Sequence, residues 1–79
     1  MTTVPDSQGP PKGFQSVNST NVAGGDYDSA ERTLTVTFKS GSEYQYEEVE
    51  PDVALAFFKA PSPGRFVRNV LSSYSYSGG

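Results

Sequence analysis

Two arginines, Arg65 and Arg68, stand three residues apart directly after the segment Ser62-Pro63-Gly64. Serine followed by proline is typical of a helix start, because serine caps free N–H groups and proline already has the backbone angle of the first turn. Side chains three apart lie on one side of a helix, and guanidinium groups bind phosphate or carboxylate. A glycine there lets a ligand approach the N–H groups at the positive helix end. We therefore predict an anion-binding site made of Ser62, Gly64, Arg65 and Arg68.

Tyr44 and Tyr46 alternate with polar residues in the segment 43–47, so they share one face of a predicted strand. Aromatic side chains on a strand can stack on the bases of single-stranded nucleic acid. They can also pack in a core with their hydroxyls at its rim. The predicted pairing sets them beside Val36 and Phe38, so core packing is favoured, and a hydroxyl remains as a candidate ligand contact near the arginines.

The chain has few side chains that could act in catalysis or bind a metal, because it contains neither histidine nor cysteine. A serine would have no histidine as its base, and no thiolate nucleophile exists. Glu47 and Glu48 point to opposite faces of a strand and do not converge. The segment Asp26-Tyr27-Asp28 lacks the third ligand and the glycine of a calcium loop. We therefore expect no enzyme activity, no metal site and no cofactor.

The net charge of −3 is unevenly distributed. Residues 51–79 carry three basic side chains against one acidic side chain, whereas most carboxylates precede them. An acidic protein is a poor general binder of nucleic acid, but a local basic patch can hold one small anion. The alternative is that Arg65 and Arg68 are solvated or paired with Glu47 or Glu48.

A length of 79 residues with 34% hydrophobic residues and a mean hydropathy of −0.51 predicts one small domain with a modest core. Self-association would reinforce such a core and is left open as a homo-oligomer. We expect a disordered leader over 1–13, a domain over 14–74 and a flexible tail over 75–79. No segment resembles a signal peptide or a membrane span, so the expected location is the cytoplasm, or the host cytoplasm if the chain is phage-encoded.

The elements follow from periodicity and turn residues. A short strand is expected within 14–22, a bend at 23–25 and a turn at 28–31. Residues 33–38 and 43–47 alternate as two strands of a hairpin. A three-residue loop, or a five-residue loop in the same register, would pair Lys39 with Glu43, Phe38 with Tyr44 and Val36 with Tyr46. Helices are expected from Pro51 to about Ala60 and from Pro63 to about Ser73. The predicted fold is α+β: a small antiparallel sheet (β-β-β) with two helices packed on one face.

In this order and spacing, the residues of about 16–74 resemble the KTSC domain, a short module found at the C-terminus of some lysyl-tRNA synthetases and alone in small bacterial and phage proteins. The matching segments are Ser19-Thr20-Asn21-Val22, Tyr27-Asp28, Leu34–Phe38, Tyr44-Gln45-Tyr46, Val49-Glu50-Pro51, Ala60–Phe66 and Tyr74. The chain departs from the family pattern at Pro63 and at Val67-Arg68. The resemblance implies the fold, whereas RNA binding has only been suggested for the family.

Two functions are therefore expected. The first is a non-catalytic binding module for a phosphorylated ligand, a nucleotide or RNA. The alternative is a protein-interaction or self-assembling module, such as a phage accessory protein, that uses a strand edge or the Phe57/Phe58 pair.

Overall fold

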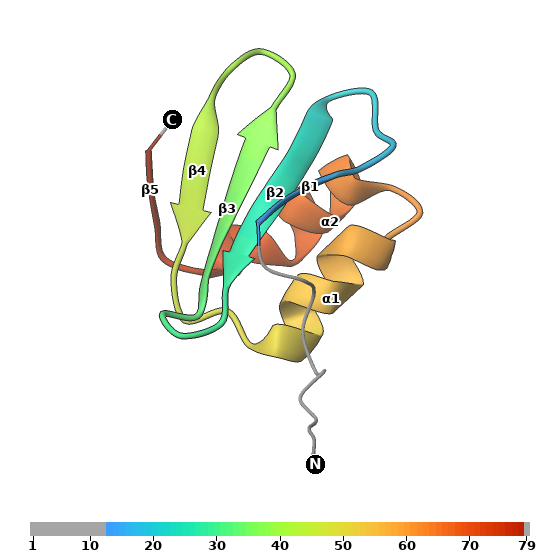
Figure 1. Ribbon diagram of the computed structural model, residues 1–79. Helices are drawn as coiled ribbons and strands as arrows, with labels where there is room; N and C mark the ends of the chain where they lie inside the picture. Colours follow the sequence, from blue (N-terminus) through green and yellow to red (C-terminus); the bar gives the residue numbers. More distant parts are fainter. Residues whose placement is uncertain (1–12, 79) are drawn as a thin grey trace.

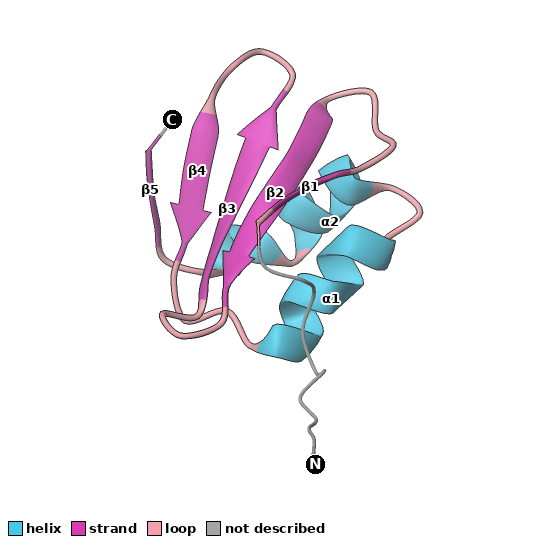
Figure 2. Ribbon diagram, viewed as in Figure 1, coloured by secondary structure: helices cyan, strands magenta, loops and turns pink. Residues whose placement is uncertain are grey.

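The computed structural model describes residues 13–78 as a five-stranded antiparallel sheet with helices on one face (Figure 1). The strands lie in chain order across the sheet: β1 (Phe14–Ser16), β2 (Val22–Asp28), β3 (Thr33–Phe38), β4 (Glu43–Tyr46) and β5 (Tyr76–Gly78). Between β4 and β5 the chain forms α1 (Pro51–Lys59), α2 (Pro63–Asn69) and a short 3-10 helix, η1 (Leu71–Ser73). Both α-helices cover the same face of the sheet (Figure 2). The predicted α+β class is confirmed, with five strands in place of three. The predicted leader lies outside the described residues except for Gly13.

The β3–β4 hairpin keeps the predicted faces, but its predicted register is wrong by two residues. Val36 pairs with Tyr44, where the sequence predicted pairs between Phe38 and Tyr44 and between Val36 and Tyr46. The cause is Gly41, whose φ of +101° is the left-handed conformation that closes a three-residue loop. Its N–H donates to the carbonyl of Phe38 at 2.9 Å, so the loop lies one residue earlier than predicted. Because the shift is an even number of residues, the inward side chains stay inward.

Strand β2 was not predicted, because Gly24 and Gly25 resemble a bend in the sequence. In the structure both glycines are buried within the strand, next to a bulge between Val22 and Gly24. A Cβ on Gly25 would lie 3.0 Å from the ring of Phe57, and a Cβ on Gly24 would collide with the Gln15 carbonyl of β1. The two glycines therefore let α1 pack closely on the sheet and let β1 pair closely with β2.

The residues expected as a flexible tail, 75–79, contain strand β5. Tyr76 pairs with Tyr46 and Gly78 with Tyr44, and the N–H of Glu47 donates to the carbonyl of Ser75 at 2.8 Å. A Ser-Gly-rich segment has little strand propensity of its own. Its order comes from pairing with β4, which the local sequence does not indicate.

Helix α1 matches its predicted start and end, whereas α2 is shorter than predicted. The helix ends at Asn69, and the chain tightens into η1 rather than continuing to Ser73 as α-helix. The Ser73 hydroxyl donates to the carbonyl of Val70 at 3.0 Å within this tighter turn. Ser62 begins α2 without a side-chain cap, and its carbonyl accepts from the N–H of Phe66 at 3.0 Å.

The core lies between the sheet and the helices. Its fully or nearly fully buried members come from every layer: Val22, Tyr27, Leu34, Val36, Tyr46, Val49, Ala54, Phe57, Val67 and Leu71. The Tyr27 hydroxyl donates to the carbonyl of Val49 at 2.6 Å, which ties β2 to the segment that leads into α1. No helix within residues 13–78 is long and apolar enough to cross a membrane.

Candidate functional site

A polar pocket of about 250 Å³ lies between the β1–β2 loop and the start of α2. The loop residues Asn18–Asn21 form one wall, and residues 61–65 with Arg68 form the other. The turn at Pro61 brings the second wall into place, because proline ends α1 and lets α2 start in a new direction. The structure thus brings together four of the six predicted site residues: Ser62, Gly64, Arg65 and Arg68.

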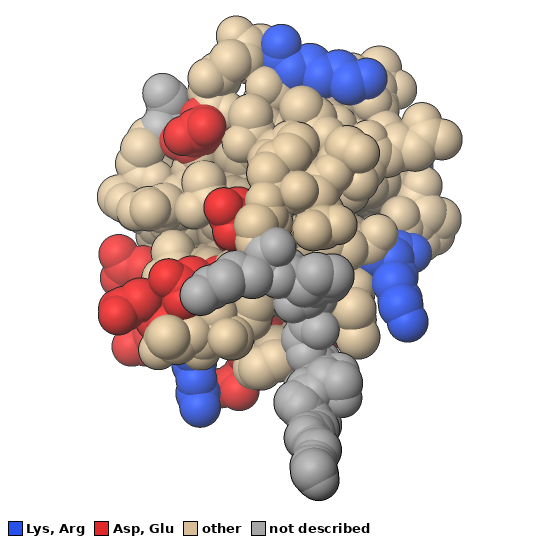
Figure 3. Space-filling view, in the orientation of Figure 1, with Lys and Arg blue, Asp and Glu red and all other residues tan. Residues whose placement is uncertain are grey.

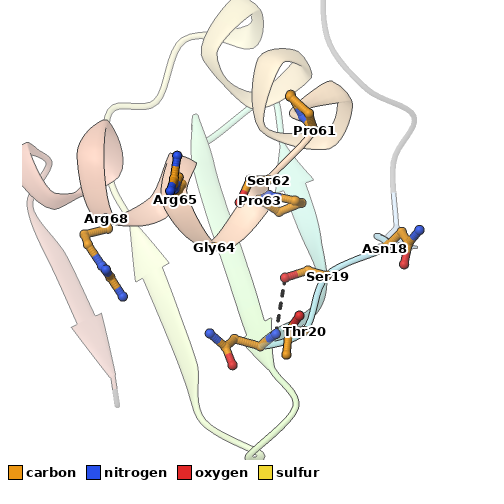
Figure 4. Close-up of a pocket in the computed structure, with 10 residues that line it drawn as sticks. Asn18, Ser19, Thr20, Pro61, Ser62, Pro63, Gly64, Arg65 and Arg68 are labelled. Carbon is orange, nitrogen blue, oxygen red and sulfur yellow. Dashed lines mark hydrogen bonds between the residues drawn. The ribbon is translucent and has the colours of Figure 1, made fainter.

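Gly64 sits at the middle of this pocket (Figure 4). A Cβ at this position would meet only the Ser19 hydroxyl oxygen, at 3.9 Å. Ser19 and Arg68 lie on either side of Gly64, and Arg65 stands on the helix above (Figure 4). The glycine therefore leaves the floor of the pocket open to a ligand.

Ser19 is oriented by its own loop. Its hydroxyl oxygen accepts the N–H groups of Asn21 at 3.3 Å and of Val22 at 3.2 Å. Because both backbone groups donate to this oxygen, the hydroxyl proton is left to donate elsewhere. The loop wall therefore offers a hydrogen-bond donor to the pocket.

The arginines are exposed and available. The ion pair found within residues 13–78 joins Arg32 to Glu50 at 3.1 Å, so neither Arg65 nor Arg68 is paired with a carboxylate of that part of the chain. Pairing with Glu47 or Glu48, the alternative considered from the sequence, is not observed among those residues. No acidic side chain lines the pocket, so its local charge is positive.

The start of α2 itself contributes less than the sequence suggested. The helix has seven residues, and Pro63 at its first position is buried and has no N–H group. The Ser62 side chain makes no capping bond within the described chain. The arginines and the loop hydroxyls, rather than the helix end, define the chemistry of the pocket.

Tyr44 and Tyr46 do not line this pocket. Tyr46 is 4% exposed and Tyr44 is half-buried against the core. Their rings stack with centroids 6.4 Å apart, and Phe38 meets Tyr44 edge-on at 5.5 Å. Burial raises the pKa of the Tyr46 hydroxyl above its ordinary value. The packing role favoured by the sequence is the one observed.

A second hollow lies on the opposite, open face of the sheet, and its charge is negative. It is lined by Asp26, Asp28 and Glu31, with threonines of β3 and Gln45 beside them. Figure 3 shows acidic side chains gathered toward one end of this face, with basic side chains at its rim. Within residues 13–78 no group of three acidic side chains is arranged to hold a metal ion. The two pockets therefore differ in the sign of their charge.

The sequence does not indicate that the loop Asn18–Asn21 belongs to the site. The segment Ser19-Thr20-Asn21 contributes only to the family resemblance. Its place opposite α2 depends on the pairing of β1 with β2 and on the turn at Pro61. Neither can be inferred from the local pattern of the loop.

Comparisons with known proteins agree with this architecture. A model of the KTSC domain matches residues 18–76. A protein of Tsukamurella paurometabola is 39% identical over 58 residues, which cover 73% of this chain and 87% of that protein. A protein of Stutzerimonas stutzeri is 40% identical over 50 residues, covering 63% and 70% of the two chains. The crystal structure of a KTSC domain protein from Yersinia pestis superposes with a TM-score of 0.77 at 29% identity, covering 85% of this chain and 96% of that one. The chain therefore belongs to the KTSC domain family.

Proposed function

We propose that this protein is a non-catalytic binding module for a phosphorylated ligand, a nucleotide or the phosphate end of an RNA. The observation that supports the proposal is the pocket between the β1–β2 loop and α2. It combines two arginines that have no ion-pair partner within residues 13–78 with hydroxyl and amide side chains and no carboxylate.

The chemistry of the pocket suits a phosphate group. Guanidinium groups form charge-assisted, often bidentate hydrogen bonds with phosphate oxygens. The Ser19 proton and the amide groups of the loop supply further donors. The absence of histidine and cysteine from the sequence supports binding rather than acid–base or thiol catalysis.

A thermal-shift panel tests the proposal. We expect AMP, pyrophosphate and a short 5′-phosphorylated RNA to raise the melting temperature at low salt and less at high salt, because exposed charge interactions are screened. A hydrogen bond to a charged group contributes about 1.5–3 kcal/mol. The Arg65→Ala/Arg68→Ala variant should therefore bind at least tenfold more weakly.

Lys39→Ala/Lys59→Ala is the matched control. It removes the same charge from two exposed positions outside the pocket. If both double variants lose the shift equally, only general electrostatic attraction is at work. The absence of a shift with all three ligands would also contradict the proposal.

A second candidate is self-assembly through a strand edge. The outer strands, β1 and β5, have three residues each. They carry the most exposed large apolar side chains of residues 13–78, Phe14 at 55% and Tyr76 at 53%. The version that uses Phe57 and Phe58 has less support, because Phe57 is fully buried and Phe58 is partly buried against the core. If this candidate holds, light scattering at increasing concentration should show a mass above one chain, and a mass that stays at one chain would contradict it.

A further inference from the structure

Strand β5 pairs with the edge of β4 through two distinctive residues, the aromatic Tyr76 and the glycine Gly78. The Tyr76 ring lies beside both tyrosines of β4, with centroids 5.3 Å from Tyr44 and 5.5 Å from Tyr46. Gly78 pairs with Tyr44 at a φ of +106°, and a Cβ there would collide with the carbonyl oxygen of Glu43. The β4 edge is therefore shaped for an extended strand with an aromatic residue and, two residues later, a glycine.

The strand that fills this edge is weakly held. All three residues of β5 are exposed, and Tyr76 keeps 53% of its surface in contact with solvent. A strand of three residues has few ladder hydrogen bonds, and such edge segments open locally far more often than the whole domain unfolds. When β5 leaves, the unpaired N–H and C=O groups of β4 become available to another strand.

We propose that the β4 edge is a strand-binding site that a second copy of this chain can fill with its own Tyr76–Gly78. Every copy carries both the acceptor edge and the strand that fits it, so an exchange between two copies preserves each contact described above. The equilibrium then depends on concentration, since a tethered strand competes with an effective concentration on the order of millimolar. At micromolar concentration the chain remains mostly monomeric and exchanges β5 as a minor population.

A covalent trap detects this population, and the chain suits it because it contains no cysteine. Gln45 and Ser77 are paired across β4 and β5 and are both exposed. Directly paired residues of an antiparallel ladder are close enough for a disulfide. We would mix a full-length Gln45→Cys chain with a full-length, mass-tagged Ser77→Cys chain in a redox buffer that oxidises thiols, and follow the mixed dimer on a non-reducing gel. The control mixture is Ser40→Cys with Ser77→Cys, because Ser40 is exposed at the hairpin loop and has no partner residue in β5. If the exchange occurs, the Gln45→Cys mixture should form its mixed dimer at least tenfold faster than this control.

Two further variants make the result decisive. A single chain that carries both Gln45→Cys and Ser77→Cys should close an internal disulfide, which tests the β4–β5 register itself. Adding Gly78→Val to the Ser77→Cys chain should reduce the mixed-dimer rate to that of the Ser40 control. Equal rates for the Gln45 and Ser40 mixtures, or no internal disulfide in the double variant, would overturn the proposal. The β4 edge lies outside the anion pocket, so this result is independent of the phosphate experiments.

Discussion

Replacing Tyr27 by phenylalanine removes one oxygen atom from the core and should destabilise the domain more than any other loss of a single hydroxyl. The Tyr27 side chain is 1% exposed, and its hydroxyl donates to the carbonyl of Val49 at 2.6 Å. The variant loses this bond and leaves a buried carbonyl without its donor, which costs about 1–3 kcal/mol. We expect a total loss of about 2 kcal/mol.

Tyr46→Phe is the matched comparison within the same core. Tyr46 is 4% exposed, yet its hydroxyl takes part in none of the side-chain hydrogen bonds found within residues 13–78. Removing a hydroxyl that has no protein partner leaves no acceptor without its donor. The free energy of unfolding of this variant should therefore lie within about 0.5 kcal/mol of that of the parent. The pair isolates the bond, because both changes delete the same atom from a buried ring.

Urea unfolding followed by circular dichroism measures the difference. A loss of 2 kcal/mol lowers the melting temperature of a domain of this size by about 8–16 °C, which a thermal scan would also detect. If Tyr27→Phe were as stable as the parent, or Tyr46→Phe equally destabilised, the Tyr27–Val49 bond would not be the tie between β2 and the segment before α1.

Two further predictions concern the core. Gly25→Ala places a methyl group 3.0 Å from the Phe57 ring and from the Thr35 carbonyl, so overpacking should cost about 1–3 kcal/mol in urea unfolding, and an unchanged stability would mean that α1 does not rest on Gly25. Burial raises the pKa of both the Tyr27 and the Tyr46 hydroxyls, so the folded state holds these protons more tightly than the unfolded chain. The contribution of these two hydroxyls to stability should therefore be constant up to about pH 10, the pKa of an unfolded tyrosine, and fall as the pH rises toward the higher folded values. A Tyr27→Phe/Tyr46→Phe variant should lose that alkaline slope.

The parts of the fold that the sequence predicts well are those whose pattern is local. Alternation in Thr33–Phe38 and the proline at the start of each helix identify β3, α1 and α2, because burial on one face and the fixed proline angle act within a few residues. Strand β2 could not be predicted, because Gly24 and Gly25 make room for residues that are distant from them in the chain. A glycine that makes room for Phe57 looks the same in the sequence as a glycine that makes a bend.

The candidate site also has one part that the local sequence predicts and one part that it does not. Arg65 and Arg68 follow one another on one helix, and their spacing alone brings them together. The loop that faces them could not be predicted, because its position depends on long-range strand pairing. Tyr44 and Tyr46 are predicted as ligand contacts because their hydroxyls are expected at the rim of the core near the arginines, but neither residue lines the pocket.

The most direct test of the proposed function is a nuclear magnetic resonance titration of the ¹⁵N-labelled full chain with AMP. Binding at the pocket predicts saturable shifts of the backbone amides of residues 18–21 and 64–68, with little change on the acidic face around Asp26. The same titration of Arg65→Ala/Arg68→Ala should show those shifts lost or at least tenfold weaker. Shifts that stay linear with concentration, or that centre on residues outside the pocket, would contradict the assignment of this site to a phosphorylated ligand.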